Sequence, residues 1–383
     1  MGSLIIARKM SEPFIIATSD WHFGKRQYGL KFREHDRYAA GHALVDYAIK
    51  HQVPAILNGG DTLDVTRPSS KAVSQLKEIH NKLVKAKIPM YVVQGNHDRV
   101  DPPWYNLFDA HPEFGVQLIG GRTVEIAIGT KKYTLAGIDE KPKDQLIKAI
   151  EEVKHADILL LHASVQEWIG FPSATALSLQ DDIPKNRFRL VVIGDTHIHD
   201  YRELEDGTAF LSPGAIENGT KAEPREFHIT RLGSTLQYDT VPLPTRPVVD
   251  VYARTDDELK AADKTLQKLR RGTGGLAYLY YNPKLENTSI LFAQTDAPEY
   301  YLTPIAIQEE EATVENVEDA TEGKRLMTIG EFAAKAHGNP LVNNCLQRIL
   351  LSQTKTADLV EELCTTCTPT FVEDANVNAS TPG

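Results

Sequence analysis

Short apolar runs rich in β-branched residues alternate with amphipathic stretches over roughly the first 240 residues. Each run is short and apolar enough to be a buried strand. The runs are residues 14–18, 55–57, 90–93, 158–161 and 190–193. Helical patterns, with apolar residues every three to four positions, cover 38–51, 70–86 and 143–154. Such alternation is typical of an α/β layered fold, in which helices cover the faces of sheets.

A change of pattern near residue 245 indicates a second, smaller unit. Strand patterns at 248–253 and 276–281 flank a helical pattern over 256–270. We therefore predict one large domain over 1–245 and a small α+β domain over 246–305.

The last part of the chain differs again. Residues 306–327 are rich in Glu and Asp and poor in aromatic residues, which is typical of a solvated linker. Residues 328–364 carry short amphipathic helical patterns, and Thr328 and Glu331 have the spacing of a capping box. Thr, Pro and Asn dominate residues 365–383, which we expect to be disordered.

Composition and charge narrow the class of protein without indicating its function. The 383 residues are 41% hydrophobic, as in globular chains, and no stretch reaches the ~18 apolar residues of a membrane span. The net charge is −10, so bulk charge does not predict a broad basic surface for nucleic acid. The three Cys predict no disulfide framework, and the N-terminal apolar run is too short for a secretory signal, so we expect a cytoplasmic protein. Cys364 and Cys367 are spaced like metal ligands but lack a second pair, which favours a plain surface pair.

Residue types that bind metals directly follow five of the predicted strands. In chain order they are Asp20 and His22, Asp61 and Asp64, Asn96 and His97, His162, and His197 and His199. In α/β sheets, ligands bind where loops converge at the carboxyl ends of the strands. Residues two apart in extended chain point the same way, so each pair can face one site. A single motif of this kind is more often a turn or cap, but five in order indicate one functional site.

The ligand types predict two divalent metal ions and phosphoester chemistry. Carboxylate, imidazole and amide oxygen together suit Mn or Fe, because the set holds too much nitrogen for Mg or Ca alone. A carboxylate with two free oxygens, such as that of Asp61, can bridge two ions ~3.5–4 Å apart. That geometry is used for the hydrolysis of phosphoesters.

The motif order resembles the calcineurin-like metallophosphoesterase superfamily, and within it the SbcD-type DNA double-strand-break repair nucleases, which include phage recombination endonuclease subunits. The similarity covers about residues 13–250. Its motifs are D-W-H-F-G at 20–24, G-D-T-L-D at 60–64, G-N-H-D-R at 95–99 and S-P-G-A-I-E at 212–217. The resemblance implies a layered α/β sandwich with a small capping domain and a C-terminal helical segment. It also implies hydrolysis of backbone phosphodiesters at DNA ends, by exonuclease and endonuclease action.

The resemblance further assigns roles to the site residues. Asp20, His22 and His199 would hold the first metal ion and Asn96, His162 and His197 the second, with Asp61 bridging the two. His97 would not bind metal but would donate a proton to the leaving oxygen or position the phosphate. The implied cofactors are two divalent ions, with Mn²⁺ favoured, and the nucleophile is a hydroxide that bridges them.

Two positions depart from the pattern of this family. The last motif reads Gly-Asp-Thr-His-Ile-His over 194–199, one residue longer than the usual Gly-His-x-His, so Asp195 could perturb the loop. The family often has His where Asp64 stands, and we expect Asp64 to support a ligand rather than to bind metal.

Basic and aromatic side chains near the motifs suggest how DNA is held. After the first motif, five Lys and Arg residues lie among aromatic ones between positions 25 and 37. This cluster fits either a rail along the phosphate backbone or an ordinary solvated face. The DNA contacts that we predict are Lys25, Arg26, Lys31, Arg33, Arg67 and Arg99.

The resemblance also implies partners. They are a second copy of the chain, meeting it through part of 69–85 or 102–108, and an SbcC-type SMC-like ATPase. Residues 328–364 would dock on that ATPase or else simply cap the domain. The location would be the cytoplasm of a bacterium or of a phage-infected cell. Two other functions stay open: a phosphodiesterase of cyclic or dinucleotides, and a catalytically silent scaffold.

Overall fold

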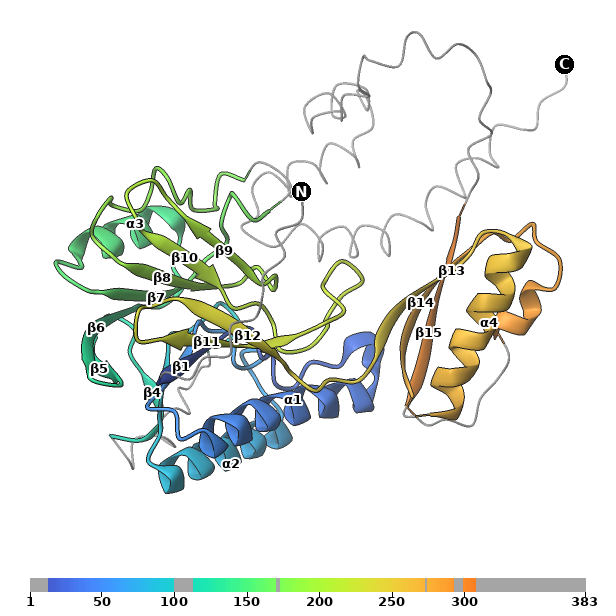
Figure 1. Cartoon of the computed structure of the whole chain (residues 1–383), viewed down its shortest axis with the longest axis horizontal. Coiled ribbons are helices and arrows are strands. Elements are labelled where there is room, and N and C mark those ends of the chain that lie inside the picture. Colours follow the sequence, from blue (N-terminus) through green and yellow to red (C-terminus); the bar gives the residue numbers. More distant parts are fainter. Residues whose placement is uncertain (1–12, 100–112, 170–172, 273, 293–298, 308–383) are drawn as a thin grey trace, which may run out of the picture. The chain divides into compact units, whose positions relative to one another are not determined.

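Two six-stranded sheets form the larger part of the fold (Figure 1), in a computed structural model that describes residues 13–99, 113–169, 173–272, 274–292 and 299–307. In spatial order, the first sheet contains β12 (Tyr238–Pro242), β11 (His228–Gly233), β1 (Phe14–Thr18), β2 (Ile56–Asn58), β3 (Pro89–Val92) and β4 (Gly115–Leu118). The second contains β5 (Thr123–Ile128), β6 (Lys131–Ile138), β7 (Ile158–His162), β8 (Leu190–Gly194), β10 (Ala209–Ser212) and β9 (Asp200–Glu203). Strands β1 to β4 pair in parallel, as do β6, β7, β8 and β10.

Alternate residues of each central strand face different layers. In β1, Phe14 and Ile16 belong to the core beneath helices α1 (Lys31–Lys50) and α2 (Ser70–Ala86). Ile15 and Ala17 belong to the core between the two sheets. The far face of the second sheet packs on α3 (Lys143–Glu152). The order helices, sheet, sheet, helix confirms the predicted α/β layered sandwich.

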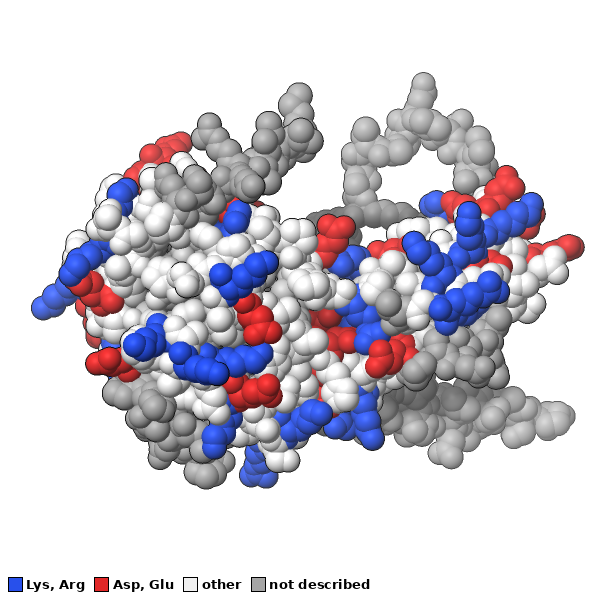
Figure 2. Space-filling view, turned by 60° about the horizontal axis from the view of Figure 1, so that its bottom comes forward, with Lys and Arg blue, Asp and Glu red and all other residues white. Residues whose placement is uncertain are grey.

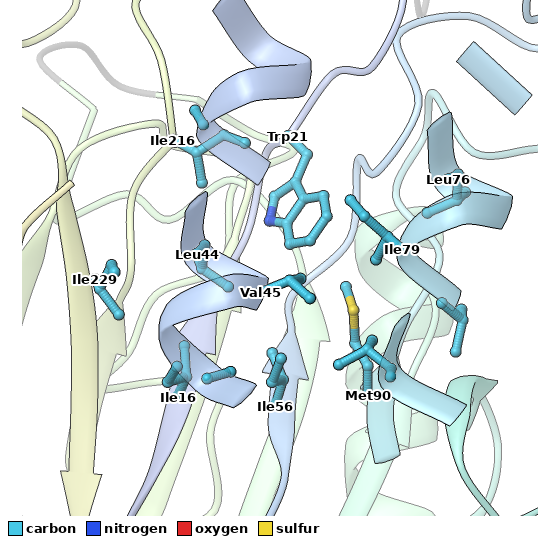
Figure 3. Close-up of a cluster of buried hydrophobic side chains, with 14 of the residues drawn as sticks. Ile16, Trp21, Leu44, Val45, Ile56, Leu76, Ile79, Met90, Ile216 and Ile229 are labelled. Atoms are coloured by element: carbon cyan, nitrogen blue, oxygen red, sulfur yellow. The ribbon is translucent and has the colours of Figure 1, made fainter. Parts of the chain in front are cut away.

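The core under α1 and α2 anchors the first site loop (Figure 3). Figure 3 shows side chains of both helices packed on the strands of the first sheet, namely Leu44, Val45, Leu76 and Ile79 against Ile16, Ile56, Met90 and Ile229. Trp21 is fully buried at the end of this cluster, and its Nε1 donates to Thr18 Oγ1 at 2.9 Å. Burial of an indole of this size removes enough apolar surface from water to hold the neighbouring chain firmly.

A third, smaller sheet follows, and two of its three strands lie where the pattern predicts strands, at 248–253 and 276–281. It is parallel and contains β13 (Val248–Ala253), β14 (Gly275–Tyr281) and β15 (Tyr300–Ala306). Helix α4 (Asp256–Arg271) and the 3₁₀ helix η3 (Thr288–Phe292) pack on it. The domain boundary at residue 245 stays a prediction. The linker, helices and tail predicted for 306–383 lie outside the described residues, apart from residues 306 and 307. Within the described ranges, no helix is both long and apolar enough to cross a membrane.

Candidate metal centre

The carboxyl ends of strands from both sheets meet at one place. The loops after β1 and β2 are joined by backbone hydrogen bonds, from Asp20 N to Gly60 O and from His22 N to Asp61 O, both at 2.9 Å. The loop after β8 reaches the same place, where Asp195 N lies 3.2 Å from both carboxylate oxygens of Asp20. The loops that carry Asp20, Asp61 and Asp195 therefore meet, although their strands belong to two different sheets.

Asp61 lies between two groups of candidate ligands. Its Oδ2 is 3.6 Å from His22 Nε2, while its Oδ1 is 3.6 Å from His162 Nε2. Asp20, His22 and His197 form the first group, with His22 and His197 Nε2 atoms 3.0 Å apart. Asp20, Asp61 and His162 form the second, and a further group joins His22 and Asp61 to His97. One carboxylate oxygen toward each group is the arrangement that a bridging ligand needs.

The donor atoms fit metal ions. His162 is fully buried, and its Nε2 has no hydrogen-bond partner among the described residues. Its Nδ1 donates to Gly59 O at 2.8 Å, which turns Nε2 toward Asp61. His197 Nδ1 donates to Glu223 Oε1 at 2.8 Å, and His22 Nδ1 lies 3.3 Å from Asp64 Oδ1. Imidazoles held at one nitrogen by an oxygen, with the other nitrogen inward, are typical of metal ligands.

Electrostatics also favour a cation at this place. Burial, together with the Asp20 carboxylate, raises the pKa of Asp61 to about 6. Burial alone would lower the pKa of His162, but the carboxylates of Asp61 and Asp195 raise it to about 10. The buried carboxylates thus require positive charge, which a proton or a metal ion can supply.

Left-handed backbone marks the same residues. Positive φ occurs at Asp20 (55°), His22 (46°), Asp61 (51°), Asp195 (106°) and His197 (58°). Such conformations are uncommon for residues with a side chain and persist where the surroundings enforce them, often at functional sites.

Glycines let the loops approach closely. A Cβ on Gly95 would meet Asp61 Oδ1 at 2.1 Å, which explains the Gly before Asn96. Gly60 has φ of +100°, and a Cβ there would lie 2.7 Å from His162 Nδ1.

The turn after β3 carries Asn96 and His97. Asp98 holds this turn against the second loop, since its carboxylate accepts from the amides of Thr62, Leu63 and Gly95. His97 N donates to Asp61 Oδ1 at 3.0 Å, and His97 Nδ1 contacts Asp64 O. The His97 side chain is 28% exposed, with Nε2 3.9 Å from Asp61 Oδ2, so it lies on the open side of the site. That exposure is what a proton donor needs, and His97 also lies within ligand distance of His22 and Asp61.

The two histidines of the last motif lie differently from the metal-binding roles that the resemblance implies, and those roles stay predictions. His197 lies with Asp20 and His22, the first group, rather than with the second. His199 and Asp195 both lie outside the ligand groups found among the described residues; His199 Nδ1 is 3.4 Å from Thr230 Oγ1, whereas Asp195 Oδ1 is 3.5 Å from His162 Nε2. The reason is that β8 ends at Gly194 and Asp195 turns directly into the site, so the loop is not one residue longer.

The predicted DNA contacts divide into buried and exposed residues. Arg33 is buried, with Nη2 2.9 Å from Glu217 Oε1 and Nη1 2.7 Å from Asp36 Oδ2, so it is a structural residue and not a surface contact. Lys25 Nζ lies 3.8 Å from Asp64 Oδ1, and Arg26 is 2.5 Å from Glu34. The side chains of Lys31, Arg67 and Arg99 are exposed, and Arg99 pairs with Glu140.

Charge does not segregate on the face that can be seen in Figure 2, where Lys and Arg mix with Asp and Glu. That mixture provides no continuous basic rail on this face. The segment 102–108 and the pair Cys364 and Cys367 lie outside the described residues.

Sequence reasoning missed two functional carboxylates. Glu223, 26 positions after His197, orients that imidazole and accepts from Gly219 N at 2.5 Å. Asp98 follows His97 in the third motif, and only the fold shows that its carboxylate joins two loops. No spacing in the sequence connects Glu223 to His197, whereas the position of Asp98 inside a motif was an available signal.

Known proteins resemble this chain in sequence. Residues 15–201 match the calcineurin-like phosphoesterase family. The DNA double-strand break repair protein Mre11 of Sulfurisphaera tokodaii is 29% identical over 256 residues, covering 64% of each chain. The protein of the same name from Methanosarcina mazei is 26% identical over 260 residues, covering 64% of this chain and 40% of that one. This chain therefore spans less than two thirds of the length of either relative. The structure of the calcineurin-like phosphoesterase YfkN from Bacillus subtilis aligns with 60% of this chain and 88% of that one, at 12% identity and a TM-score of 0.35.

Proposed function

Residues 15–201 form a calcineurin-like phosphoesterase domain, and from this premise we propose that the chain is a two-metal DNA nuclease. It would hydrolyse backbone phosphodiesters at DNA ends, by exonuclease and endonuclease action, in double-strand-break repair or recombination. The observation that carries the proposal is Asp61, which lies between two sets of inward imidazole nitrogens. The DNA substrate is supported by the relatives, which are named as DNA double-strand break repair proteins.

Each residue has a stated part in this proposal. One ion would be held by Asp20, His22 and His197, and the other by Asn96 and His162. Asp61 would bind both ions. Two bound Mn²⁺ ions would supply an activated water and charge stabilisation at the phosphate. His97, held through Nδ1 by Asp64 O, presents Nε2 to the open side and delivers a proton to the leaving oxygen.

Partners and location belong to the same proposal. We expect a homodimer, and residues 328–364 are proposed to dock on an SbcC-type SMC-like ATPase in the cytoplasm. Light scattering of the purified chain measures its oligomeric state, and a monomer at micromolar concentration would argue against the dimer. Co-purification with such an ATPase tests the docking. A chain lacking 328–364 that is retained as well as the full chain would contradict it.

The test of the activity is digestion of end-labelled duplex DNA with Mn²⁺, with Mg²⁺ and with a chelator. We expect cleavage that needs the metal, and the His97→Ala variant should cleave about 10²–10⁴-fold more slowly while still binding two ions. His155→Ala, which changes an exposed histidine, is the matched control and should cleave normally.

Other outcomes separate the alternatives. Brisk hydrolysis of a small phosphodiester without DNA cleavage would replace the nuclease with a phosphodiesterase of small nucleotides. Two bound ions with neither activity would indicate the silent scaffold.

A further inference from the structure

We propose that Asp195 is a ligand of the second metal ion, at the position where the family pattern Gly-His-x-His has its first histidine. This inference rests on the proposed two-metal site and adds to it a residue outside the predicted ligand set. With β8 ending at Gly194, residues 194–197 read Gly-Asp-x-His in register with that pattern. His197 then takes the role of the last histidine, and His199 has no role at the metals.

The geometry of the carboxylate carries the assignment. Asp195 Oδ1 lies 3.5 Å from His162 Nε2, and Asp61 Oδ1 lies 3.6 Å from the same atom. That nitrogen is fully buried and makes no hydrogen bond to any described residue. Both carboxylate oxygens thus lie within 3.6 Å of the nitrogen at the end of β7, one from the loop after β2 and one from the loop after β8. Asp195 is in none of the ligand groups found among the described residues, so its assignment rests on these two distances and on the register of the motif.

The surroundings hold Asp195 in this orientation. Its Oδ2 accepts a hydrogen bond from Ser164 Oγ, two residues after His162, which leaves Oδ1 directed at the site. Its amide donates to the Asp20 carboxylate, so the backbone is fixed to the first ligand loop. Asp195 has φ of 106°, a conformation that side chains rarely adopt. Glycine adopts this φ without strain, and the aspartate that stands here instead uses its carboxylate to bind Ser164 and to face His162.

Replacement of imidazole by carboxylate changes which metal the second site prefers. The set Asp61, Asn96, His162 and Asp195 offers three oxygens and one nitrogen. Carboxylate and carbonyl oxygens suit Mn²⁺ and Mg²⁺, whereas imidazole suits Zn²⁺ and other later metals. The second site should therefore favour Mn²⁺ over Zn²⁺ more strongly than a site with two imidazoles.

Metal titration of the full-length chain tests the assignment without reference to activity. Calorimetric titration with Mn²⁺ should show two ions bound by the wild type. Asp195→Ala should bind one ion as before and the second at least about tenfold more weakly, since even supporting residues of metal ligands contribute 10–100-fold. Asp195→His should restore the second ion and raise its preference for Zn²⁺ over Mn²⁺ at least about tenfold.

Two controls separate the ligand role from other roles. Ser164→Ala removes the hydrogen-bond partner but keeps the carboxylate, and it should retain two ions with a smaller loss of affinity. His199→Ala should bind both ions as the wild type does.

The inference is overturned if Asp195→Ala binds two Mn²⁺ ions with wild-type affinity, or if His199→Ala loses one. Should Asp195→Ala not fold, an unchanged metal preference in Asp195→His would overturn it equally. These results are independent of the proposed nuclease, because failure of that proposal would appear as two bound ions without DNA cleavage.

Discussion

Two of the inward imidazoles at the metal centre are held by an oxygen that is hydrogen-bonded to the opposite side of the ring. For His162 the oxygen is the backbone carbonyl of Gly59, and for His197 it is the carboxylate of Glu223. Burial would raise the pKa of Glu223, but its hydrogen bond and charge interaction with His197 lower it, so the pair is mutually supported. Such a carboxylate fixes the ring and increases its basicity as a ligand.

We predict that Glu223→Gln weakens binding of the ion at Asp20, His22 and His197 by about 10–100-fold, because the amide no longer supplies the charge that supports His197. Calorimetric titration with Mn²⁺ measures this loss. The matched control is Glu226→Gln, an exposed neighbour, which should leave the affinity unchanged. Equal affinities for the two variants would show that Glu223 has only a structural role.

Among the elements, helix α1 differs most from its predicted extent. The apolar pattern predicts a start at residue 38, yet the helix begins at Lys31. Its first turns bury charged side chains, including Arg33, which pairs with the distant Glu217, and Glu34, which pairs with Arg26. A pattern of polar positions cannot reveal this, because it treats a paired, buried charge as a solvated one.

Glu34 provides the pH-dependent prediction for this helix. Although burial raises its pKa, hydrogen bonds from Tyr38 (2.7 Å) and Arg26 (2.5 Å) outweigh that effect and lower it below 4.5. Because the folded pKa is depressed, the stabilisation is present above about pH 4.5 and disappears as pH falls through the folded value. Glu34→Gln should reduce the free energy of unfolding by about 1–2 kcal/mol at pH 7, and by progressively less toward pH 3.

Urea unfolding at pH 7, 5 and 3 measures this dependence. Glu78→Gln, on the exposed face of α2, should change stability by no more than about 0.5 kcal/mol at any of these pH values. A loss for Glu34→Gln that is the same at every pH would contradict the assigned cause.

Across the whole molecule, a buried polar network connects the small sheet to the metal centre. Asn218 Oδ1 accepts from Gln27 Nε2 at 2.8 Å and from the hydroxyl of Tyr278, on β14, at 3.2 Å. Asn218 Nδ2 donates to the carbonyls of Thr220 and Pro224, which lie on either side of Glu223 in the loop. The residue that orients His197 is thus held by contacts with the small sheet.

Asn218→Ala should therefore affect two properties together. Removal of the amide takes away its hydrogen bonds to Gln27, Tyr278, Thr220 and Pro224, which should cost about 1–3 kcal/mol of unfolding free energy. The loop that carries Glu223 would also be less constrained, so Mn²⁺ affinity should fall. Urea unfolding and Mn²⁺ titration measure the two effects, with the exposed Thr235→Ala as control. Lower stability with unchanged Mn²⁺ affinity would show that the network does not support the site.

Local sequence patterns were sufficient to predict the central strands, one helix and several neighbouring site residues. Apolar runs identified the central strands, helix α2 was predicted at its observed bounds, and strand-end motifs identified Asp20, His22, Asp61 and His162 as neighbours. These inferences succeed because each depends on a short pattern and on the convergence of strand ends. Strands β4, β9, β11, β12 and β15 were not predicted, because their stability comes from pairing with distant segments.

Only the folded structure shows which residues of the last motif, 194–199, point toward the candidate metal ligands. A spacing of two allows either Asp195 and His197 or His197 and His199 to point inward, and only the end of β8 and the positive φ at Asp195 select the first pair. It also decided that Arg33 is buried and that Glu223 supports His197, since both depend on residues more than 20 positions away. Contacts of that range are set by packing and charge pairing in the folded chain, which no local pattern encodes.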